Sequence, residues 1–175
     1  DWLPGVPLNS DAGVIDVRRD LSLISPAIFS EIFQAIKRQQ GLRISYKSMT
    51  HPLGTDRLVF PHALVRAPRR WHMRAWCTER SDFLDFTLGR IGAVKSDSTS
   101  HPGVGKNRSQ DLGWTKVVDL LIAPHPALSE DQKKMIAGEF FPGAASLRLK
   151  ARECLAPYIV QDFRLATDWR RQVPP

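Results

Sequence analysis

Apolar residues first recur at helical spacing between residues 26 and 38. Ser25 is a typical N-cap, and Pro26 suits the first helical position because the N–H group that it lacks would have no partner there. Gly41 is expected to end this helix. The apolar stripe consists of Ile28, Phe29, Ile32, Phe33 and Ile36. Residues 1–24 are rich in Pro, Gly, Asn and Asp, which predicts an irregular lead-in with a short strand at 14–17.

After Gly41 the pattern changes to the alternation of apolar and polar residues that half-buried strands show, beginning with residues 42–48. A turn is expected at 51–56, and four more strand-like runs follow with short, turn-like separators. These runs are 57–65, 71–78, 83–88 and 90–94. One helix and about five strands in such a short stretch favour a small closed or partly closed barrel, because closure removes exposed strand edges.

The last third of the chain has a different pattern. Residues 96–113 are poor in apolar side chains and predict a mobile linker. Ser129 and Gln132 have the spacing of a capping box, which predicts a helix over roughly residues 130–140. The other expected elements are a buried strand at 116–123, a short strand at 146–149, a helix within 151–160 and a final strand near 163–165. Together they predict a compact α/β module.

The expected fold is therefore α+β, with a helix and an Sm-like or SH3-like β-barrel followed by a small α/β domain. The expected boundaries are a lead-in at 1–24, the barrel at 25–95, a linker at 96–114 and the α/β domain at 115–170. The chain has 175 residues, of which 42% are hydrophobic and 25% are charged, as in an ordinary soluble protein. No apolar run approaches the ~20 residues that a membrane helix needs, and no signal peptide is recognisable.

The two cysteines, Cys77 and Cys154, have no second Cys or His at the spacing of a zinc site. We expect two free, buried thiols in a reducing compartment, although a disulfide between them is the alternative. The expected location is the cytoplasm.

The net charge of +7 is unevenly distributed. Residues 37–95 carry 12 Lys and Arg against 4 Asp and Glu, which makes this segment +8, whereas residues 1–36 are −3 and residues 96–175 are +2. A concentrated positive field attracts anions such as phosphates, nucleotides or nucleic acid. A solvated basic face without a ligand is the alternative.

Strand alternation predicts how side chains divide over residues 70–77. Trp71, Met73 and Ala75 should share one face. The opposite face would hold Arg70, His72, Arg74 and Trp76. Guanidinium groups can bind phosphate through two hydrogen bonds, and aromatic rings can stack on bases, so this second face suits a planar, anionic ligand.

No pattern indicates catalysis. The sequence has no Gly-x-Ser-x-Gly motif, and the glycines around Lys106 lack the spacing and the Ser or Thr of a phosphate-binding loop. The five histidines include no pair at i, i+4 that would suggest a metal site on a helix. We therefore expect a protein that is not an enzyme and that has neither a metal nor a cofactor.

Several motifs, in this order, resemble a WYL domain. They are Ile44-Ser45-Tyr46-Lys47-Ser48, Phe60-Pro61-His62-Ala63-Leu64-Val65, Arg70-Trp71-His72-Met73-Arg74-Ala75-Trp76-Cys77 and Phe86-Thr87-Leu88-Gly89-Arg90-Ile91. The Trp-Tyr-Leu triplet of the family stands here as Trp71-His72-Met73. Residues 119–126 and later Arg152 and Tyr158 resemble the extension that commonly follows such a domain.

The resemblance implies a transcriptional regulator, most similar to dimeric repressors associated with anti-phage defence islands. A winged helix-turn-helix would bind DNA, and nothing before Ser25 is expected to form its helices, so the chain is expected to be an excised fragment or an unusually short member. The barrel would bind a nucleotide or nucleic-acid effector, and the C-terminal module would form a homodimer. Many members have an Arg, a candidate effector contact, where Leu84 stands in this sequence.

The candidate ligand contacts combine both lines of reasoning. Tyr46 and Ser48 would share a face of the first strand, and Arg74→Ala or Arg90→Ala is expected to abolish the response to an effector while the fold stays intact. The full set is Tyr46, Ser48, His62, Arg70, His72, Arg74 and Arg90. The alternatives are a stand-alone module that binds RNA or single-stranded nucleic acid and a structural dimerisation scaffold without a ligand.

Overall fold

The computed structural model describes residues 24–67, 70–97, 105–166, 168 and 170–171. The strand expected at 14–17 lies outside these residues. The described chain is a mixed α+β structure with one larger and one smaller antiparallel sheet.

Helix α1 (Pro26–Arg38) begins as the sequence predicts. The hydroxyl of Ser25 accepts a hydrogen bond from the N–H of Ile28 at 3.5 Å, and Pro26 occupies the first helical position. The helix ends before Gly41, which is the first residue of β1. Gln39 adopts the left-handed conformation instead (φ 54°), and its N–H is bonded to carbonyls of the last turn. The expected role of Gly41 as the helix stop was wrong.

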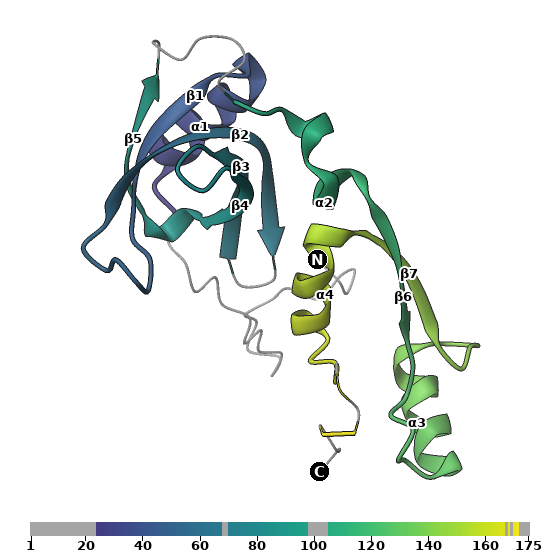
Figure 1. The fold of residues 1–175 in the computed structure, drawn as a ribbon. Helices are drawn as coiled ribbons and strands as arrows, with labels where there is room; N and C mark the ends of the chain where they lie inside the picture. Colours follow the sequence, from purple (N-terminus) through teal and green to yellow (C-terminus); the bar gives the residue numbers. More distant parts are fainter. Residues whose placement is uncertain (1–23, 68–69, 98–104, 167, 169, 172–175) are drawn as a thin grey trace, which may run out of the picture.

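Five strands follow α1 and form a single antiparallel sheet (Figure 1). Its order is β4-β3-β2-β1-β5. The strands are β1 (Gly41–Tyr46), β2 (Thr55–Ala67), β3 (Arg70–Cys77), β4 (Asp82–Thr87) and β5 (Ile91–Asp97). A short 3-10 turn, η1 (Leu88–Arg90), joins the last two. The pairings of the described residues do not join β4 to β5, so the expected closed barrel is not confirmed.

The hydrophobic core lies between α1 and the inner face of this sheet. Ile32 of α1 and Met73 and Ala75 of β3 are fully buried in it. Trp71 packs at its margin, where its ring makes an edge-to-face contact with Phe29 (centroids 5.3 Å apart). The division of β3 into two faces is therefore confirmed, because one face supplies the core. Both cysteines are free, so no disulfide joins them, but only Cys77 is buried as expected, in this core, whereas Cys154 is half-buried.

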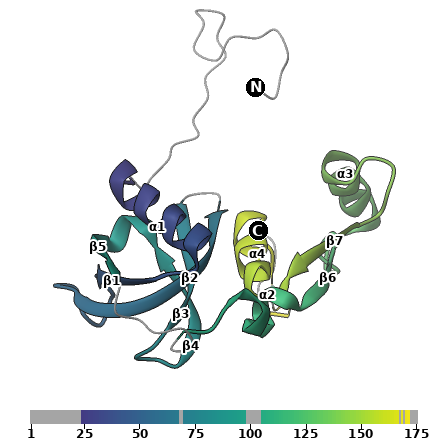
Figure 2. The same ribbon diagram turned by 90° about the horizontal axis from the view of Figure 1, so that it is seen from above.

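The C-terminal module is less compact than expected (Figure 2). Strands β6 (Val117–Ile122) and β7 (Leu147–Arg152) form a two-stranded sheet within the described ranges, and α3 (Glu130–Phe140) lies in the connection between them. Helix α3 begins with the predicted capping box of Ser129 and Gln132. Strand β6 was expected to be buried, but Val117 and Leu121 are 58% and 62% exposed, because a two-stranded sheet covers few side chains.

Two further expectations about this part of the chain were wrong. The final strand near 163–165 is absent. The turn η3 (Glu153–Leu155) leads into α4 (Ala156–Asp162), and the chain turns away from the end of this helix at Arg164, whose φ is 51°. The expected mobile linker has regular structure over its described residues. It contains η2 (Arg108–Gln110) and leads into α2 (Leu112–Thr115).

In both ribbon views α4 lies between the larger sheet and the β6–β7 pair (Figures 1 and 2). This position brings a helix of the C-terminal module against strands of the barrel-like part. No helix in the described ranges is long and apolar enough to cross a membrane.

Candidate functional site

The outer face of β3 consists of Arg70, His72, Arg74 and Trp76 and is turned toward the C-terminal module. His72 and Trp76 are only 7% and 8% exposed. The ring of Trp76 is covered by the ammonium group of Lys106, 4.2 Å from its centroid. The face predicted to meet a ligand is therefore largely covered by residues that follow β5 in the sequence.

Arg74 binds two carboxylates, Asp111 from the segment that follows β5 and Asp85 from the neighbouring strand β4. Its Nε and Nη2 donate to the two oxygens of Asp111 at 2.8 and 3.0 Å, and its Nη1 donates to Asp85 at 3.3 Å. Asp111 is 1% exposed and also caps α2 by accepting from the N–H of Trp114. Burial would lower the pKa of Arg74, but hydrogen bonds and charges from Asp111 and Asp85 raise it. Arg74→Ala would leave a buried carboxylate without its main partner, so a loss of stability, and not an intact fold, is expected.

His62 binds the same carboxylate from β2. Its Nε2 lies 2.9 Å from Oδ2 of Asp111, while its Nδ1 is buried without a hydrogen-bond partner among the described residues. Because the carboxylate of Asp111 can only accept, Nε2 of His62 carries the ring proton and Nδ1 is unprotonated. Burial lowers the pKa of His62 more than Asp111 raises it, so the ring is neutral near pH 7. Burial would raise the pKa of Asp111, but Arg74 and His62 lower it.

Tyr158 connects α4 to β3 and β4. Its hydroxyl donates to Oδ2 of Asp85 at 2.8 Å and lies 3.4 Å from Nδ1 of His72. The two rings are tilted by 41° with their centroids 4.7 Å apart. Burial, followed by the neighbouring charge of Asp85, raises the pKa of Tyr158, so the hydroxyl keeps its proton. We call His62, His72, Arg74, Asp85, Asp111 and Tyr158 the junction cluster.

Arg70 and Arg90 differ from Arg74 in having no ion pair with any residue that the structure describes. Burial lowers the pKa of His72, and the charges of Arg70 and Arg90 lower it further, against the opposing effect of Asp85. Both arginines are thus close enough to His72 to act on it. Arg70 at the start of β3 and Arg90 in η1 therefore carry positive charge near His72 that no described carboxylate pairs with, whereas Arg74 is neutralised by two carboxylates.

The structure places Tyr46 and Ser48 elsewhere. Tyr46 is 8% exposed in the core, where its hydroxyl accepts from the N–H of Thr87 at 3.3 Å. Strand β1 ends at Tyr46, and Ser48 lies in the following turn with its hydroxyl bonded to Thr50 and to the N–H of His51. The expectation that they share one strand face was wrong. Of the seven predicted contacts, His62, His72 and Arg74 belong to the junction cluster, Arg70 and Arg90 act on His72 alone, and Tyr46 and Ser48 belong to neither group.

Comparison with protein families assigns both parts of the chain. Residues 27–96 match the family described as the WYL domain. Residues 117–175 match the family described as the BrxR transcriptional regulator, C-terminal dimerization domain. The chain therefore combines a WYL domain with a C-terminal dimerization domain of the BrxR type. The resemblance on which the sequence analysis relied is confirmed.

Similar full-length proteins are named DNA-binding transcriptional repressor CapW. The protein from Pseudomonas aeruginosa is 33% identical over 148 residues, which cover 84% of this chain and 48% of that protein. The protein from Escherichia coli strain KTE188 is 30% identical over 162 residues, which cover 92% of this chain and 52% of that protein. The chain thus spans about half the length of these relatives. Among solved structures, proteasome accessory factor B/C of Arthrobacter aurescens aligns over 79% of this chain and 23% of its own, with 21% identity and a TM-score of 0.42.

Sequence reasoning missed three residues of the junction cluster. Asp85 stands opposite Arg74 in the register of β3 and β4 within the WYL domain, so correct strand pairing would have indicated that ion pair. Asp111 lies in a segment that its polar composition marked as a linker. Tyr158 was matched to the dimerization domain, but nothing in the local sequence indicates that its hydroxyl reaches back to the WYL domain. No group of metal-binding side chains was found within the described part of the chain.

Proposed function

We propose that this chain is the effector-sensing and dimerisation part of a transcriptional repressor. In this proposal the WYL domain binds a phosphate-bearing ligand, either a nucleotide or a short nucleic acid, and a winged helix-turn-helix outside residues 1–175 contacts DNA. The relatives named DNA-binding transcriptional repressors support the regulatory role. The helix and five-stranded antiparallel sheet support an Sm-like or SH3-like barrel as the fold of the sensing domain. No catalytic role is part of the proposal.

The observation that carries the ligand proposal is the uncompensated positive charge at one end of the outer face of β3. Arg74 has two carboxylate partners, so an added anion would compete with Asp111 and Asp85 for it. Arg70 and Arg90 have no such partners within the described residues, and both act on the ring of His72. A phosphate placed there would gain charge-assisted hydrogen bonds without displacing an existing ion pair. We therefore assign binding to Arg70, His72 and Arg90, and a structural role to Arg74.

The dimerisation proposal rests on the family match and on exposed apolar side chains of the C-terminal module. Val117 and Leu121 lie on one face of β6, and Met135 and Phe140 on α3 are 65% and 57% exposed. Burial of such a surface against a second copy would be favourable. Leu121→Glu is expected to shift the chain from dimer to monomer in light scattering after size exclusion, and an unchanged mass would contradict this interface.

The ligand proposal is tested by binding measurements with the whole chain. Fluorescence polarisation would use a labelled ten-nucleotide oligothymidine, with ATP and inorganic phosphate as competitors. Arg70→Ala and Arg90→Ala should each weaken binding about tenfold or more, as expected for a lost charge-assisted hydrogen bond. Arg38→Ala, an exposed position at the end of α1, removes the same charge and should leave affinity unchanged.

Equal affinity in wild type, Arg70→Ala and Arg90→Ala would overturn the site. Equal losses in these variants and in Arg38→Ala would show a non-specific field effect. The rival function, a stand-alone module for single-stranded nucleic acid, would appear as binding that falls steeply with salt and shows little preference among oligonucleotide sequences.

A further inference from the structure

The carboxylate of Asp111 is held on the outer face of the sheet as a bound ligand would be. Nε and Nη2 of Arg74 and Nε2 of His62 donate to its two oxygens at 2.8, 3.0 and 2.9 Å. The side chains of these two donors are only 11% and 7% exposed. A guanidinium that binds both oxygens of a planar carboxylate is a strong and specific arrangement in proteins.

The sheet builds this arrangement without any contribution from the segment that carries Asp111. The register of β2 against β3 shifts between Pro61 and Ala63, so His62 stands at an irregularity that turns its side chain toward Arg74. Asp85 faces Arg74 directly in the pairing of β3 and β4 and binds its Nη1 at 3.3 Å. Both donors are therefore fixed by the WYL domain itself.

Asp111, in contrast, belongs to a short connection outside the sheet and stands 37 residues after the arginine that it binds. It precedes α2, a helix of only four residues, which gains little stability from its own hydrogen bonds. The buried ring of Trp114 in α2 contacts the ring of His62 and lies under the guanidinium of Arg152, 4.7 Å from the ring centroid. Arg152 of β7 also donates to the carbonyl of Trp114. Asp111 and Trp114 thus connect the sheet to β7 of the dimerization domain.

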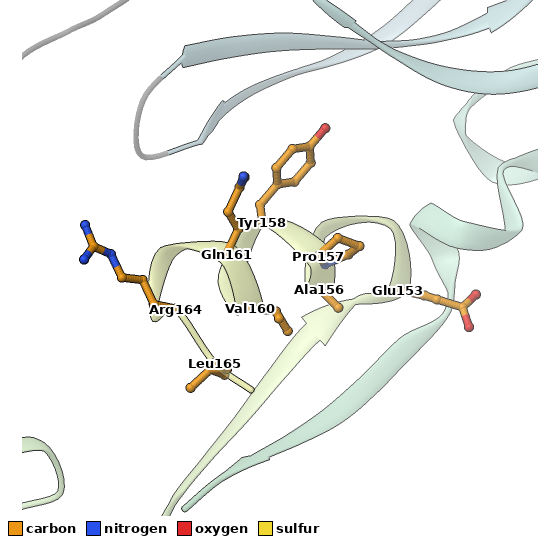
Figure 3. A pocket seen from close by; sticks show the side chains of 8 residues that line it. All are labelled: Glu153, Ala156, Pro157, Tyr158, Val160, Gln161, Arg164 and Leu165. Carbon is orange, nitrogen blue, oxygen red and sulfur yellow. The ribbon is translucent and has the colours of Figure 1, made fainter. Parts of the chain in front are cut away.

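A second contact between the domains does not involve Asp111. Figure 3 shows the ring of Tyr158 extending away from α4, and its hydroxyl donates to Asp85 of β4 at 2.8 Å. Withdrawal of Asp111 would therefore loosen α2 and β7 and leave α4 in contact with the sheet.

We propose that Arg74 and His62 form a carboxylate-binding site in the WYL domain and that Asp111 fills it as a detachable internal ligand, which seats α2 and β7 on the sheet. This inference goes beyond the proposed function and concerns a different site from Arg70 and Arg90. The ligand class is a small carboxylate, which the chain itself supplies and which a free carboxylate can replace once the side chain of Asp111 is removed.

The charges of the site favour a carboxylate over a phosphate. Arg74 and Asp85 compensate each other, so Asp111 adds one negative charge to a neutral pair. A monovalent carboxylate reproduces this balance. A phosphate dianion would bury a further negative charge close to Asp85, which is costly in a site that excludes water. The expected order of affinity is therefore the reverse of that proposed for Arg70 and Arg90.

Chemical rescue of Asp111→Ala tests the site, because this variant lacks a carboxylate and has space for formate. At pH 7.5, formate at about tenfold above its Kd should raise Tm by roughly 3–6 °C relative to the same concentration of sodium chloride. Sodium formate at about 0.2 M is the first concentration to use, and circular dichroism measures the transition. In the wild type the site is already filled, so the shift should stay below about 1 °C.

Three comparisons separate binding in the site from a general effect of the salt. Asp111→Asn fills the space with an amide of the same size, so formate should not stabilise it. The double variant Arg74→Met, Asp111→Ala lacks the main donor and should not respond either. Sodium phosphate of equal ionic strength should stabilise Asp111→Ala less than formate does. If Asp111→Ala does not fold, Asp111→Ser takes its place, because its hydroxyl can still cap α2.

Hydrogen exchange tests whether Asp111 seats the dimerization domain. In Asp111→Ala without formate, backbone amides of α2 and β7 should exchange about tenfold faster or more, because the contact that holds them is lost. Amides of β1 and α4 should exchange as in the wild type, because their contacts do not pass through Asp111. Asp131→Ala, at an exposed position of α3, should change the exchange of none of these elements.

Equal Tm values of Asp111→Ala, or of Asp111→Ser in its place, in formate and in chloride would overturn the site. An equal response to formate in Asp111→Asn or in the double variant would overturn it as well. Unchanged exchange of α2 and β7 in Asp111→Ala would overturn the role of Asp111 in seating the dimerization domain. None of these measurements uses Arg70, Arg90 or a phosphate, so failure of the proposed ligand site and failure of this inference are distinguishable.

Discussion

The buried carboxylate of Asp111 provides the sharpest test of how the two domains are held together. Asp111→Asn keeps the size of the side chain and its ability to cap α2, because Asn is as good an N-cap as Asp. It removes the charge that faces Arg74, whose side chain is 11% exposed. Breaking a buried ion pair typically costs about 3–5 kcal/mol. Because Asp85 remains as a second partner at 3.3 Å, we expect a value near the lower end, about 3 kcal/mol.

For a chain of this size, 1 kcal/mol corresponds to roughly 2–4 °C in Tm, so Asp111→Asn should lower Tm by roughly 6–12 °C. Thermal unfolding followed by circular dichroism measures this shift. The matched control is Asp131→Asn, because Asp131 is 96% exposed and, among the described residues, forms its ion pair with Lys134 at 3.7 Å on the surface of α3. Its effect should stay below about 1 kcal/mol.

A double-mutant cycle with Arg74→Met makes the test independent of general damage to the fold. If the ion pair carries the stability, the double variant should lose clearly less than the sum of the two single losses, because the second substitution no longer breaks a pair. The reasoning would be refuted if Asp111→Asn shifted Tm no more than Asp131→Asn, or if the two losses simply added.

Three further predictions concern stability. Ser25→Ala should cost about 1 kcal/mol through the lost N-cap of α1, whereas Ser30→Ala on the exposed side of the same helix should be neutral or slightly stabilising in urea unfolding. Ile32→Ala, at a position with 0% exposure, should cost about 2–5 kcal/mol, and an effect under 1 kcal/mol would contradict the assigned core. The pKa of His62 in the folded chain lies below the ordinary histidine value of 6.5, so its contribution to stability is complete above pH 6.5 and is lost as the pH falls below it. The urea midpoint should therefore drop between pH 7.5 and 5.5, and less steeply in His62→Gln.

The anchoring of residues 105–115 affects how the two domains can move. Lys106 covers the ring of Trp76, and Asp111 binds Arg74. The rings of Trp114 and His62 are in contact, with their centroids 5.1 Å apart. A Cβ atom at Gly105 would lie 2.2 Å from the ring of Phe60, so any other residue there would require the half-buried Phe60 side chain to move. These contacts hold the segment against β2 and β3. A change in the junction cluster is therefore expected to reach the dimerization domain through packed contacts.

The sequence by itself determined the features that depend on neighbours a few residues apart. The N-cap at Ser25, the capping box of α3 and the alternation along β3 each arise from interactions within one element, and the structure has all three. The order of several short motifs was sufficient to recognise the WYL family. The prediction that Gly41 ends α1 was wrong because Gln39 adopts the left-handed conformation there, which the residue type of Gln39 does not indicate.

Only the tertiary structure decided which charges of the basic segment are free. Arg74 meets Asp111 across 37 residues of sequence, and Tyr158 meets Asp85 across 73 residues. Such contacts depend on how α2 and α4 pack against the sheet, and no local spacing encodes that packing. Burial then sets the energy of each charge, because a carboxylate in a dry junction binds its partner far more strongly than one in water. For this reason composition could locate the positive segment, whereas the fold alone separates Arg74, which holds the domains together, from Arg70 and Arg90.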